Sequence, residues 1–539
     1  MLVPAEFTPV RTAVRAIRES MAEADEVDTA QGVANYIYNY EQREGSKFLL
    51  VDKSRPMLFS AVTRTLHDIS NNRRWNAHML AVYGLNAKSR FTTYVTQFLE
   101  SHAMHAGSAE ELRRFTAFKN GILYISNYDG NVWRITGQGV TFGAEGQVID
   151  DGQRTDPAED LCGIPLGIGI IPNGLEVVFA DDDGGEPMMP LEIGPTGALF
   201  KIVGGIKWAR DTGGGMLPKH QALAMITWLF ALAFPDHFPT KPLLLLEGAP
   251  GSGKSLAMQM IQAALHGKVS PIIVSKNGER DFRVALLRNP IAVLDNTDDY
   301  IDWMPNSIAA YTTGGGWTDR ELHTNTGEVR IRPQSFVAVA SKNPTSFRTT
   351  DVADRCIVLR VERRERFAPA RRVMEAITRD RPRICGEWVY YLNRLVALLN
   401  RGGLPELSNS RMADLEVFAW AVGAALNIKS FTVQSMLDSL QRERTAFASE
   451  NDSVVEALDV WVDTAGNASR YMTIRMLFKE LAELAQFDGK TFLKTPLALM
   501  QRLRAPHVID KFWINDNEVD NRGEKLYQIM RPMTMADGN

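Results

Sequence analysis

The segment that most constrains this chain of 539 residues is a glycine-rich octapeptide near its middle. It matches the pattern GxxxxGK[ST] at every fixed position and consists of Gly248, Ala249, Pro250, Gly251, Ser252, Gly253, Lys254 and Ser255. Four leucines at 243–246 precede it, and a segment with helical character begins at Leu256. This order predicts a buried strand, a tight loop and a helix, the setting that distinguishes a phosphate-binding loop from a chance glycine turn.

The residue types of this loop suit the phosphates of a nucleotide. Glycines allow backbone N–H groups to point at phosphate oxygens, and the N-terminus of the following helix adds a favourable dipole. Lys254 is expected to reach the β- and γ-phosphates, and the hydroxyl of Ser255 is expected to bind Mg²⁺. We therefore predict that ATP and Mg²⁺ bind at residues 248–256, with Leu256 opening the helix.

A second apolar run, at 291–294, delivers a carboxylate to the same region, because Asp295 and Asn296 follow it. A buried parallel strand that ends in an aspartate is expected to share the Mg²⁺ ion with Ser255, directly or through water. The amide of Asn296 can orient the attacking water but cannot accept its proton. Three nearby carboxylates could do so, and the sequence does not choose among Asp298, Asp299 and Glu247.

A third apolar run, at 336–340, is followed by Asn343 and Pro344. A polar side chain at the tip of the strand beside the phosphate-loop strand can contact the γ-phosphate and hold the attacking water. Asn343 is predicted to be this sensor. The alternative is that Asn343 caps a turn before the proline.

Arg355 precedes a fourth apolar run, at 357–360. An arginine in this place is predicted to project into the nucleotide site of a neighbouring subunit and to stabilise charge there in trans, as an arginine finger. The alternative is an ion pair with Asp351 or Asp354. Arg348 is a weaker candidate for the finger.

Two predicted hairpins carry the candidate DNA contacts. The first spans 313–333, between the Mg²⁺ aspartate and the sensor, and would point into the central channel of a ring. Its groups nearest DNA phosphates would be His323, Arg330 and Arg332. A structural ion pair with a neighbouring glutamate is the alternative for each arginine. The second hairpin lies near the C-terminus and offers Arg522 and Lys525.

Changes of pattern along the chain predict five regions. They are a helical region at 1–115, a β-rich region at 116–212 with a turn at Asn120-Gly121, a P-loop α/β core at 213–362, a helical lid at 363–450 and a C-terminal region at 451–539. The last region has predicted helices at 473–486 and 495–503 followed by a hairpin. Helices followed by a terminal hairpin suggest a winged helix.

Composition limits the class of protein. Hydrophobic residues make up 45% and charged residues 23% of the chain, as in a soluble globular protein. No run of 18 apolar residues occurs, so no contact with a membrane is expected, and three widely spaced cysteines fit a reducing cytoplasm. The net charge of −4 argues against a monomer that coats DNA. A ring, however, needs only a few basic side chains per subunit around one channel.

Together these motifs resemble the superfamily 3 AAA+ helicases, and most closely the helicase-like ATPases of phages and integrative elements related to the poxvirus primase-helicase ATPase. The resemblance rests on the order of the phosphate loop, Asp295-Asn296, the glycine-led hairpin, Asn343-Pro344 and the segment 351–355. Two departures stand out. Asn296 replaces the usual second acid, and no zinc ligands or acidic triad support a primase activity.

The resemblance implies an ATP-dependent DNA helicase or translocase that forms a homo-hexamer or another ring and acts on single-stranded or forked DNA in the replication of a phage or mobile element. It also implies an α/β fold: a P-loop AAA+ core with an α+β N-terminal region, a helical lid and a C-terminal winged helix. The alternative is a DNA-binding loader or regulatory ATPase that does not separate strands. A small-molecule kinase fits poorly, because it needs neither an arginine finger nor the hairpin.

Overall fold

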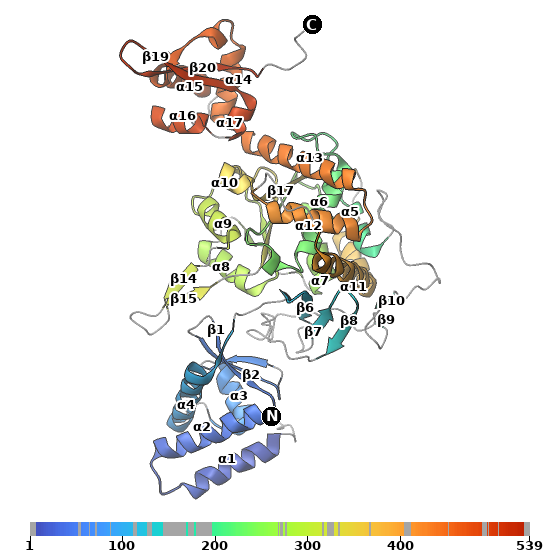
Figure 1. Cartoon of the computed structure of the whole chain (residues 1–539), viewed down its shortest axis with the longest axis vertical. Coiled ribbons are helices and arrows are strands. Elements are labelled where there is room, and N and C mark those ends of the chain that lie inside the picture. Colours follow the sequence, from blue (N-terminus) through green and yellow to red (C-terminus); the bar gives the residue numbers. More distant parts are fainter. Residues whose placement is uncertain are drawn as a thin grey trace.

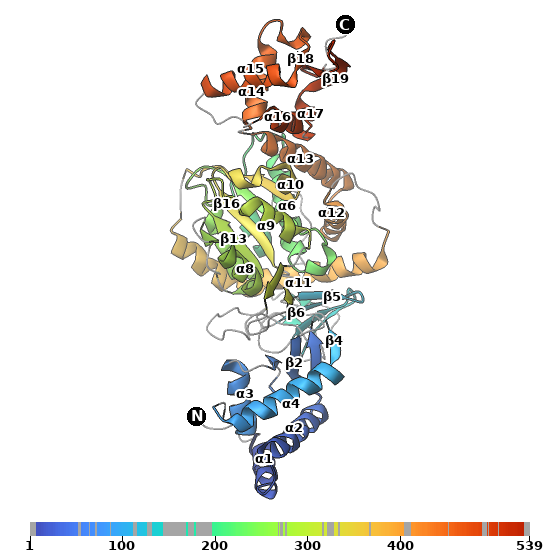
Figure 2. The same cartoon turned by 90° about the vertical axis from the view of Figure 1, so that its left-hand side faces the viewer.

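A computed structural model gives the fold of the chain (Figure 1). It describes residues 7–51, 55–63, 65–69, 73–86, 88–110, 116–126, 132–143, 169–170, 177–178, 197–267, 269, 273–274, 278–314, 317–320, 328–331, 335–365, 368–403, 411–450, 452–487, 493, 495–504 and 506–532. Figures 1 and 2 show three bodies arranged along the longest axis, with the N- and C-terminal bodies at opposite ends. Among the described residues, every helix is too short or too polar to span a bilayer.

The N-terminal body combines helices with a small sheet. Its helices are α1 (Thr8–Ser20), α2 (Glu26–Arg43), α3 (Arg73–Tyr83) and α4 (Arg90–Ala106). Its sheet has the order β3-β2-β1-β4 and consists of β1 (Lys47–Val51), β2 (Arg55–Ser60), β3 (Thr65–Asp68) and β4 (Ser108–Glu110). The sequence predicted the helices but not the sheet, because strands this short carry little periodic signal.

The β-rich region forms a meander of four antiparallel strands in chain order. They are β5 (Thr116–Lys119), β6 (Ile122–Ser126), β7 (Val132–Ile135) and β8 (Val140–Gly143). Asn120 and Gly121 join β5 to β6 with φ of 54° and 75°. Left-handed values at both positions are those of a tight hairpin turn, so the turn predicted there is confirmed. Two short strands, β9 (Gly169–Ile170) and β10 (Val177–Val178), pair separately.

The central body contains a parallel five-stranded sheet with the order β12-β13-β16-β11-β17. Its strands are β11 (Leu243–Glu247), β12 (Ile273–Val274), β13 (Ile291–Asp295), β16 (Phe336–Ser341) and β17 (Cys356–Arg360). The apolar runs predicted to be strands are therefore strands. β16 lies between β11 and β13, as predicted for the strand that carries the sensor.

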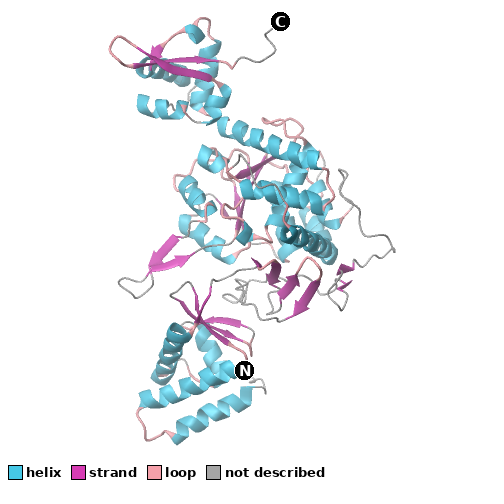
Figure 3. Ribbon diagram, viewed as in Figure 1, coloured by secondary structure: helices cyan, strands magenta, loops and turns pink. Residues whose placement is uncertain are grey.

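Helices cover both faces of this sheet. Those before and between the strands are α5 (Ala198–Gly204), α6 (Pro218–Ala231), α7 (Lys254–His266), α8 (Glu279–Arg288), α9 (Met304–Thr312) and α10 (Thr350–Ala353). The lid contributes α11 (Ala370–Arg401), α12 (Ala413–Ala425) and α13 (Ser430–Ser449). Figure 3 shows how far helices outweigh strands in this body.

Successive residues of β11 belong to two different cores. Leu244 and Leu246 pack in a core shared with α6, α7, α11 and α12, whereas Leu243 and Leu245 pack in one shared with α8 and α9. Side chains alternate between the faces of a strand, so a strand covered on both faces must be apolar at every position. Each buried leucine contributes about 1.5–3 kcal/mol. The unbroken leucine run of the sequence is thus explained.

The C-terminal body has its own core and consists of helices and a three-stranded antiparallel sheet with the order β18-β20-β19. Its elements are α14 (Ser453–Asp463), β18 (Met472–Thr473), α15 (Ile474–Phe487), α16 (Pro496–Leu503), α17 (Pro506–Lys511), β19 (Trp513–Val519) and β20 (Lys525–Met530). The side chain of Thr495 caps α16, and Gly523 turns the hairpin with φ 78°. The two helices and the hairpin predicted here are confirmed.

A carboxylate from the lid holds the start of α5. Glu387 of α11 accepts hydrogen bonds from the backbone N–H groups of Ala198 (2.7 Å) and Leu199 (2.8 Å), and only 2% of Glu387 is exposed. A negative group at a helix N-terminus satisfies donors that have no partner within the helix. This contact fixes α5 against α11.

Replacing Glu387 with alanine should therefore destabilise the central body by about 1–3 kcal/mol, because two buried N–H groups lose their acceptor. Thermal and urea unfolding followed by circular dichroism would measure the loss. Glu375→Ala is the matched control, since Glu375 lies on the same helix with 62% of its side chain exposed. It should change stability by less than about 0.5 kcal/mol. Equal losses for both variants would contradict the role of Glu387.

Candidate nucleotide-binding site

The glycine-rich loop joins β11 to α7 in the geometry that the sequence predicted. Gly251 and Gly253 have φ of 76° and 88°, values that residues with a Cβ rarely adopt. Gly253 is the N-cap of the 13-residue helix α7. A Cβ on Gly248 would lie 2.1 Å from the carbonyl oxygen of Val361, so this position requires glycine as well. The loop thus presents its backbone at the start of a helix, which suits an anion.

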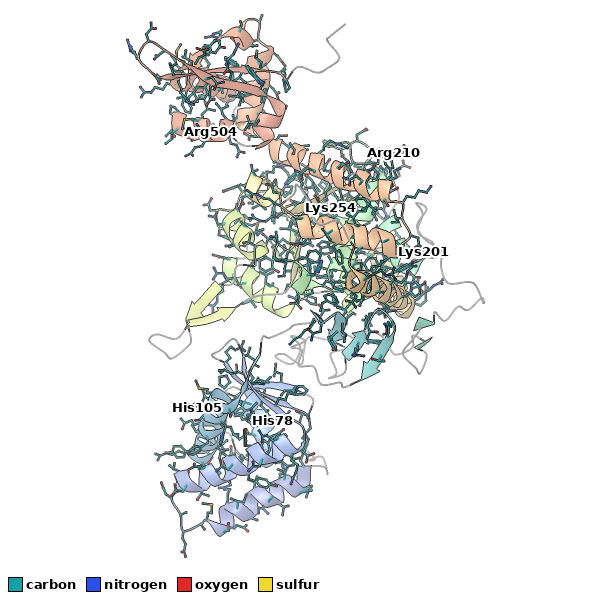
Figure 4. All side chains as sticks on the ribbon, viewed as in Figure 1. His78, His105, Lys201, Arg210, Lys254 and Arg504 are labelled. Atoms are coloured by element: carbon teal, nitrogen blue, oxygen red, sulfur yellow. The ribbon has the colours of Figure 1, made fainter. Side chains whose placement is uncertain are left out.

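Lys254 lies near the middle of the central body (Figure 4). Its side chain folds back over its own loop. Its Nζ donates to the carbonyl oxygens of Gly248 (2.7 Å) and Ala249 (3.1 Å) and to the hydroxyl of Ser252 (3.1 Å). Burial lowers the pKa of Lys254, while nearby carboxylates act to raise it, namely those of Asp295, Asp298 and Glu247. The three oxygens that hold the ammonium are neutral, so phosphate oxygens would make stronger acceptors.

Ser255 and Asp295 are brought into direct contact. The hydroxyl of Ser255, in the first turn of α7, donates to Oδ2 of Asp295 at 2.7 Å. Asp295 is the last residue of β13, and both groups lie at the carboxyl edge of the parallel sheet. A hydroxyl and a carboxylate are oxygen ligands of the kind that Mg²⁺ prefers, with water and phosphate completing its octahedron. These residues fit the predicted magnesium site.

Asp298 joins the segment after β13 to the segment after β16. Its Oδ1 accepts from the hydroxyl of Ser341 (2.5 Å) and from the backbone N–H groups of Lys342 (2.8 Å) and Asn343 (2.9 Å). Burial acts to raise the pKa of Asp298, but these three hydrogen bonds outweigh it and hold that pKa below its usual value. The carboxylate is thus a fixed anchor for the sensor segment.

The structure restricts the choice of a catalytic base. Asp298 is committed to three donors, and Glu247 is 6% exposed and forms ion pairs with Arg348 and Arg360. Asn296 is exposed and has a left-handed backbone with φ 55°. Of the three carboxylates weighed from the sequence, Asp299 is the exposed one.

Asn343 lies at the predicted place beside the loop, and its amide oxygen accepts from Nη2 of Arg348 at 3.0 Å. Arg348 is 8% exposed and pairs with Glu247 at 2.7 Å and with Glu450, the C-cap of α13, at 2.7 Å. The weaker candidate for an arginine finger therefore points inward and cannot reach a neighbour from this position. Its partner Glu450 lies 102 residues away, a separation at which sequence gives no signal.

Arg355 does not project from the chain as the sequence predicted. It is 8% exposed and forms an ion pair with Asp351 at 2.9 Å, the alternative that the sequence left open. The reason is local: Asp351 lies in the one-turn helix α10, four residues earlier, so the two side chains meet on the same face. Arg411, with 60% of its side chain exposed, also binds Asp351. A finger role for Arg355 would require this pair to open.

A pocket of about 500 Å³ adjoins the loop. Ser252, Gly253 and Leu256 form one wall, and residues of α5 and α11 such as Lys201 and Ile377 form others. The pocket begins where the phosphates would end, so it can receive the nucleoside part of a nucleotide. Leu256 was predicted from the sequence to lie at this site. The contribution of α5 and α11 to the pocket was not predicted, because neither helix carries a motif.

Only some of the candidate DNA contacts lie among the residues that the structure describes. β14 (Trp317–Arg320) and β15 (Glu328–Ile331) pair antiparallel as the predicted hairpin. Arg330 lies in β15 opposite Thr318, whereas His323 and Arg332 fall outside the described residues. In the C-terminal hairpin, Arg522 and Lys525 are both exposed, and Lys525 binds Asp516 at 3.0 Å.

Comparisons with known proteins give distant likenesses only. No family model and no curated protein matches this sequence. Two solved apo structures of the NrS-1 C-terminal region are 10% and 11% identical to it, each covering 92% of this chain and 98% or 99% of the other, with TM-scores of 0.39. A JCV helicase structure is 12% identical over 42% of this chain and 66% of its own, with a TM-score of 0.20. Likenesses this weak do not identify a function for this chain.

The contact between Ser255 and Asp295 makes a prediction about Mg²⁺. Ser255→Ala should raise the Mg²⁺ concentration needed for half-maximal binding of a fluorescent ATP analogue by about tenfold or more, since even groups outside the ligand shell commonly change metal affinity 10–100-fold. Ser307→Ala is the control, because Ser307 is a serine of α9 whose hydroxyl binds Glu279 of α8. An unchanged Mg²⁺ dependence in Ser255→Ala would remove this residue from the metal site.

Proposed function

We propose that the chain is a Mg²⁺-dependent ATPase that acts as a ring-forming DNA helicase or translocase in the replication of a phage or mobile element. The observation that carries the ATPase part is the 2.7 Å contact between Ser255 and Asp295 beside the buried ammonium of Lys254. These three side chains come from two segments 40 residues apart and converge on one loop at the edge of a parallel sheet. A structural role alone would not require that combination.

In this site each side chain has a separate task. Lys254 would exchange its loop oxygens for phosphate oxygens, and Ser255 and Asp295 would hold Mg²⁺. The ion, when bound, neutralises charge that develops on the phosphates. Asn343 would hold the γ-phosphate or the attacking water from its place after β16, and the pocket between α5, α7 and α11 would receive the nucleoside.

Two surfaces support a role on DNA. Along the chain, the β14–β15 hairpin follows β13 and precedes β16. A shift of either strand would therefore move the hairpin. Its residues His323, Arg330 and Arg332 are the proposed channel contacts. The C-terminal body combines helices with a three-stranded sheet whose hairpin exposes Arg522 and Lys525. We interpret it as a winged helix that contacts the DNA backbone, where such contacts give salt-dependent affinity.

A loader or regulatory ATPase that does not separate strands is the second candidate. The geometry around Asn296 supports this candidate, because Glu247 and Asp298 are both held by donors, which leaves the exposed Asp299 as the base among the three carboxylates. A site without a poised base would hydrolyse ATP slowly, and nucleotide binding would then control assembly more than movement. The two candidates differ in one activity, the unwinding of a forked duplex.

DNA-stimulated ATP hydrolysis and unwinding of a forked duplex should both be present in the wild type and be lost in Lys254→Ala. The loss should exceed about 10²-fold. The fold should be retained, because the hydrogen bonds of the side chain go to oxygens of its own loop. Lys342→Ala is the control, since Lys342 is an exposed lysine on the sensor segment. ATP hydrolysis without unwinding would favour the loader, and undiminished hydrolysis by folded Lys254→Ala would reject the site.

The trans role proposed for Arg355 is tested by mixing subunits. Arg355→Ala alone should lower ATP turnover by about 10³-fold, as loss of an arginine finger does. Mixed with Lys254→Ala, it should recover part of the activity, because some interfaces would pair an intact loop with an intact arginine. Asp351→Asn breaks the ion pair but keeps the guanidinium, so it should stay active. If Asp351→Asn is as inactive as Arg355→Ala, the ion pair matters rather than a finger.

A further inference from the structure

We propose that Arg348 is a positioning residue that orients the side chain of Asn343, so that the NH₂ group of Asn343 faces the phosphates of the nucleotide. This inference rests on the proposed function and assigns a role within the same site. Asn343 is close to the loop, because the N–H of Gly248 donates to the carbonyl oxygen of Ser341 at 3.2 Å. The backbone N–H of Asn343 is held by Asp298, so the side chain starts from a fixed point of the backbone.

The contact with Arg348 decides which way this amide is turned. A side-chain amide has an oxygen that accepts and a nitrogen that donates, whereas a guanidinium only donates. Nη2 of Arg348 lies 3.0 Å from Oδ1 of Asn343, so the oxygen faces the arginine and the NH₂ group points away from it. Oxygens of a γ-phosphate, and the lone pairs of an attacking water, need a donor. The reverse orientation would place two donors against each other.

Arg348 is itself held firmly enough to act as a template. Its guanidinium donates to Glu247 (2.7 Å), to Glu450 (2.7 Å) and to the carbonyl oxygen of Phe447 (2.8 Å). It also lies 4.4 Å from the centre of the Phe447 ring. A planar guanidinium fixed at both ends and stacked on a ring has little freedom to rotate. Since Phe447 and Glu450 belong to the end of α13, the lid helps to set the sensor.

Arg360 provides a matched comparison within the same ion network. It too binds Glu247 and Glu450, and it lies 5.7 Å from the centre of the Phe447 ring. The described hydrogen bonds of its side chain, however, go to Glu247, Glu443 and Glu450 and not to Asn343. If the network served stability alone, lysine at either position would have the same consequence. If Arg348 orients the sensor, only one of the two variants will affect recognition of the γ-phosphate.

The test compares affinities for a non-hydrolysable ATP analogue and for ADP, both with Mg²⁺, by titration calorimetry on the full chain. Arg348→Lys should weaken binding of the analogue about tenfold and leave ADP binding unchanged, because lysine cannot hold Glu247, Glu450 and Asn343 together. Arg360→Lys should leave the ratio of the two affinities at its wild-type value. An unchanged ratio in Arg348→Lys, or equal shifts in both variants, would overturn the proposal.

A double-mutant cycle separates orientation from a general effect on the site. Asn343→Ala should lose the preference for the analogue, and adding Arg348→Lys to it should cause no further change. Asn343→Asp keeps a partner for Arg348 but has no NH₂ group, so it should lose the preference as well. This variant decides the question even if Arg348→Lys does not fold: a wild-type preference in Asn343→Asp would show that the NH₂ group is not used.

The same measurements distinguish failure of this inference from failure of the proposed function. A wild-type chain that binds neither ligand would reject the nucleotide site and this role together. A wild-type chain that prefers the analogue, with the preference retained in Arg348→Lys, would reject only the role of Arg348.

Discussion

The carboxylate of Glu247 is the charge on which the arrangement of the central body depends. It ends β11, directly before the glycine-rich loop, and it is 6% exposed between the guanidinium groups of Arg348 and Arg360. Burying an isolated carboxylate would be prohibitive, so the partners are required. Removing one of them would leave an unpaired buried charge at a cost of about 3–5 kcal/mol. The ends of β11 and β17 and the segment that follows β16 are therefore held together by one ion network.

This network continues into the lid and ends next to the C-terminal body. Arg360 binds Glu443 of α13 at 2.7 Å, and the carboxylate of Glu443 also accepts from the N–H of Gly214 at 2.7 Å. Glu450, the C-cap of α13, lies only two residues before Asp452, which caps α14. The glycine-rich loop, the lid and the start of the next body are thus linked through side chains as far apart in sequence as Glu247 and Glu450.

Those parts of the structure that depend on local pattern could be predicted from the sequence. A strand buried on both faces leaves an unbroken apolar run, so β11, β13, β16 and β17 were found. Parallel strands end at one edge, so the approach of Asp295 to Ser255 followed from their places in the chain. The contacts made by Glu387 and Arg348 could not be predicted from the sequence. Each is a single polar residue without periodicity. Glu387 binds Ala198 at a separation of 189 residues, and Arg348 binds Glu247 at a separation of 101. The inward ion pair of Arg355 was foreseen only as an alternative.

The backbone at position 296 explains why an amide stands where a second acid is expected. Asn296 leaves β13 with φ 55°, and its N–H donates to the carbonyl oxygen of Ala340 at 3.2 Å. Asparagine tolerates this left-handed conformation better than most residues, whereas a glutamate there would be strained by about 1 kcal/mol. The turn brings Asp298 under the sensor segment, where three donors hold its charge. The sequence at this point thus favours a fixed sensor over a strong base. Under the proposed function, fast hydrolysis would then require Asp299, a rearranged loop or a group from a neighbouring subunit.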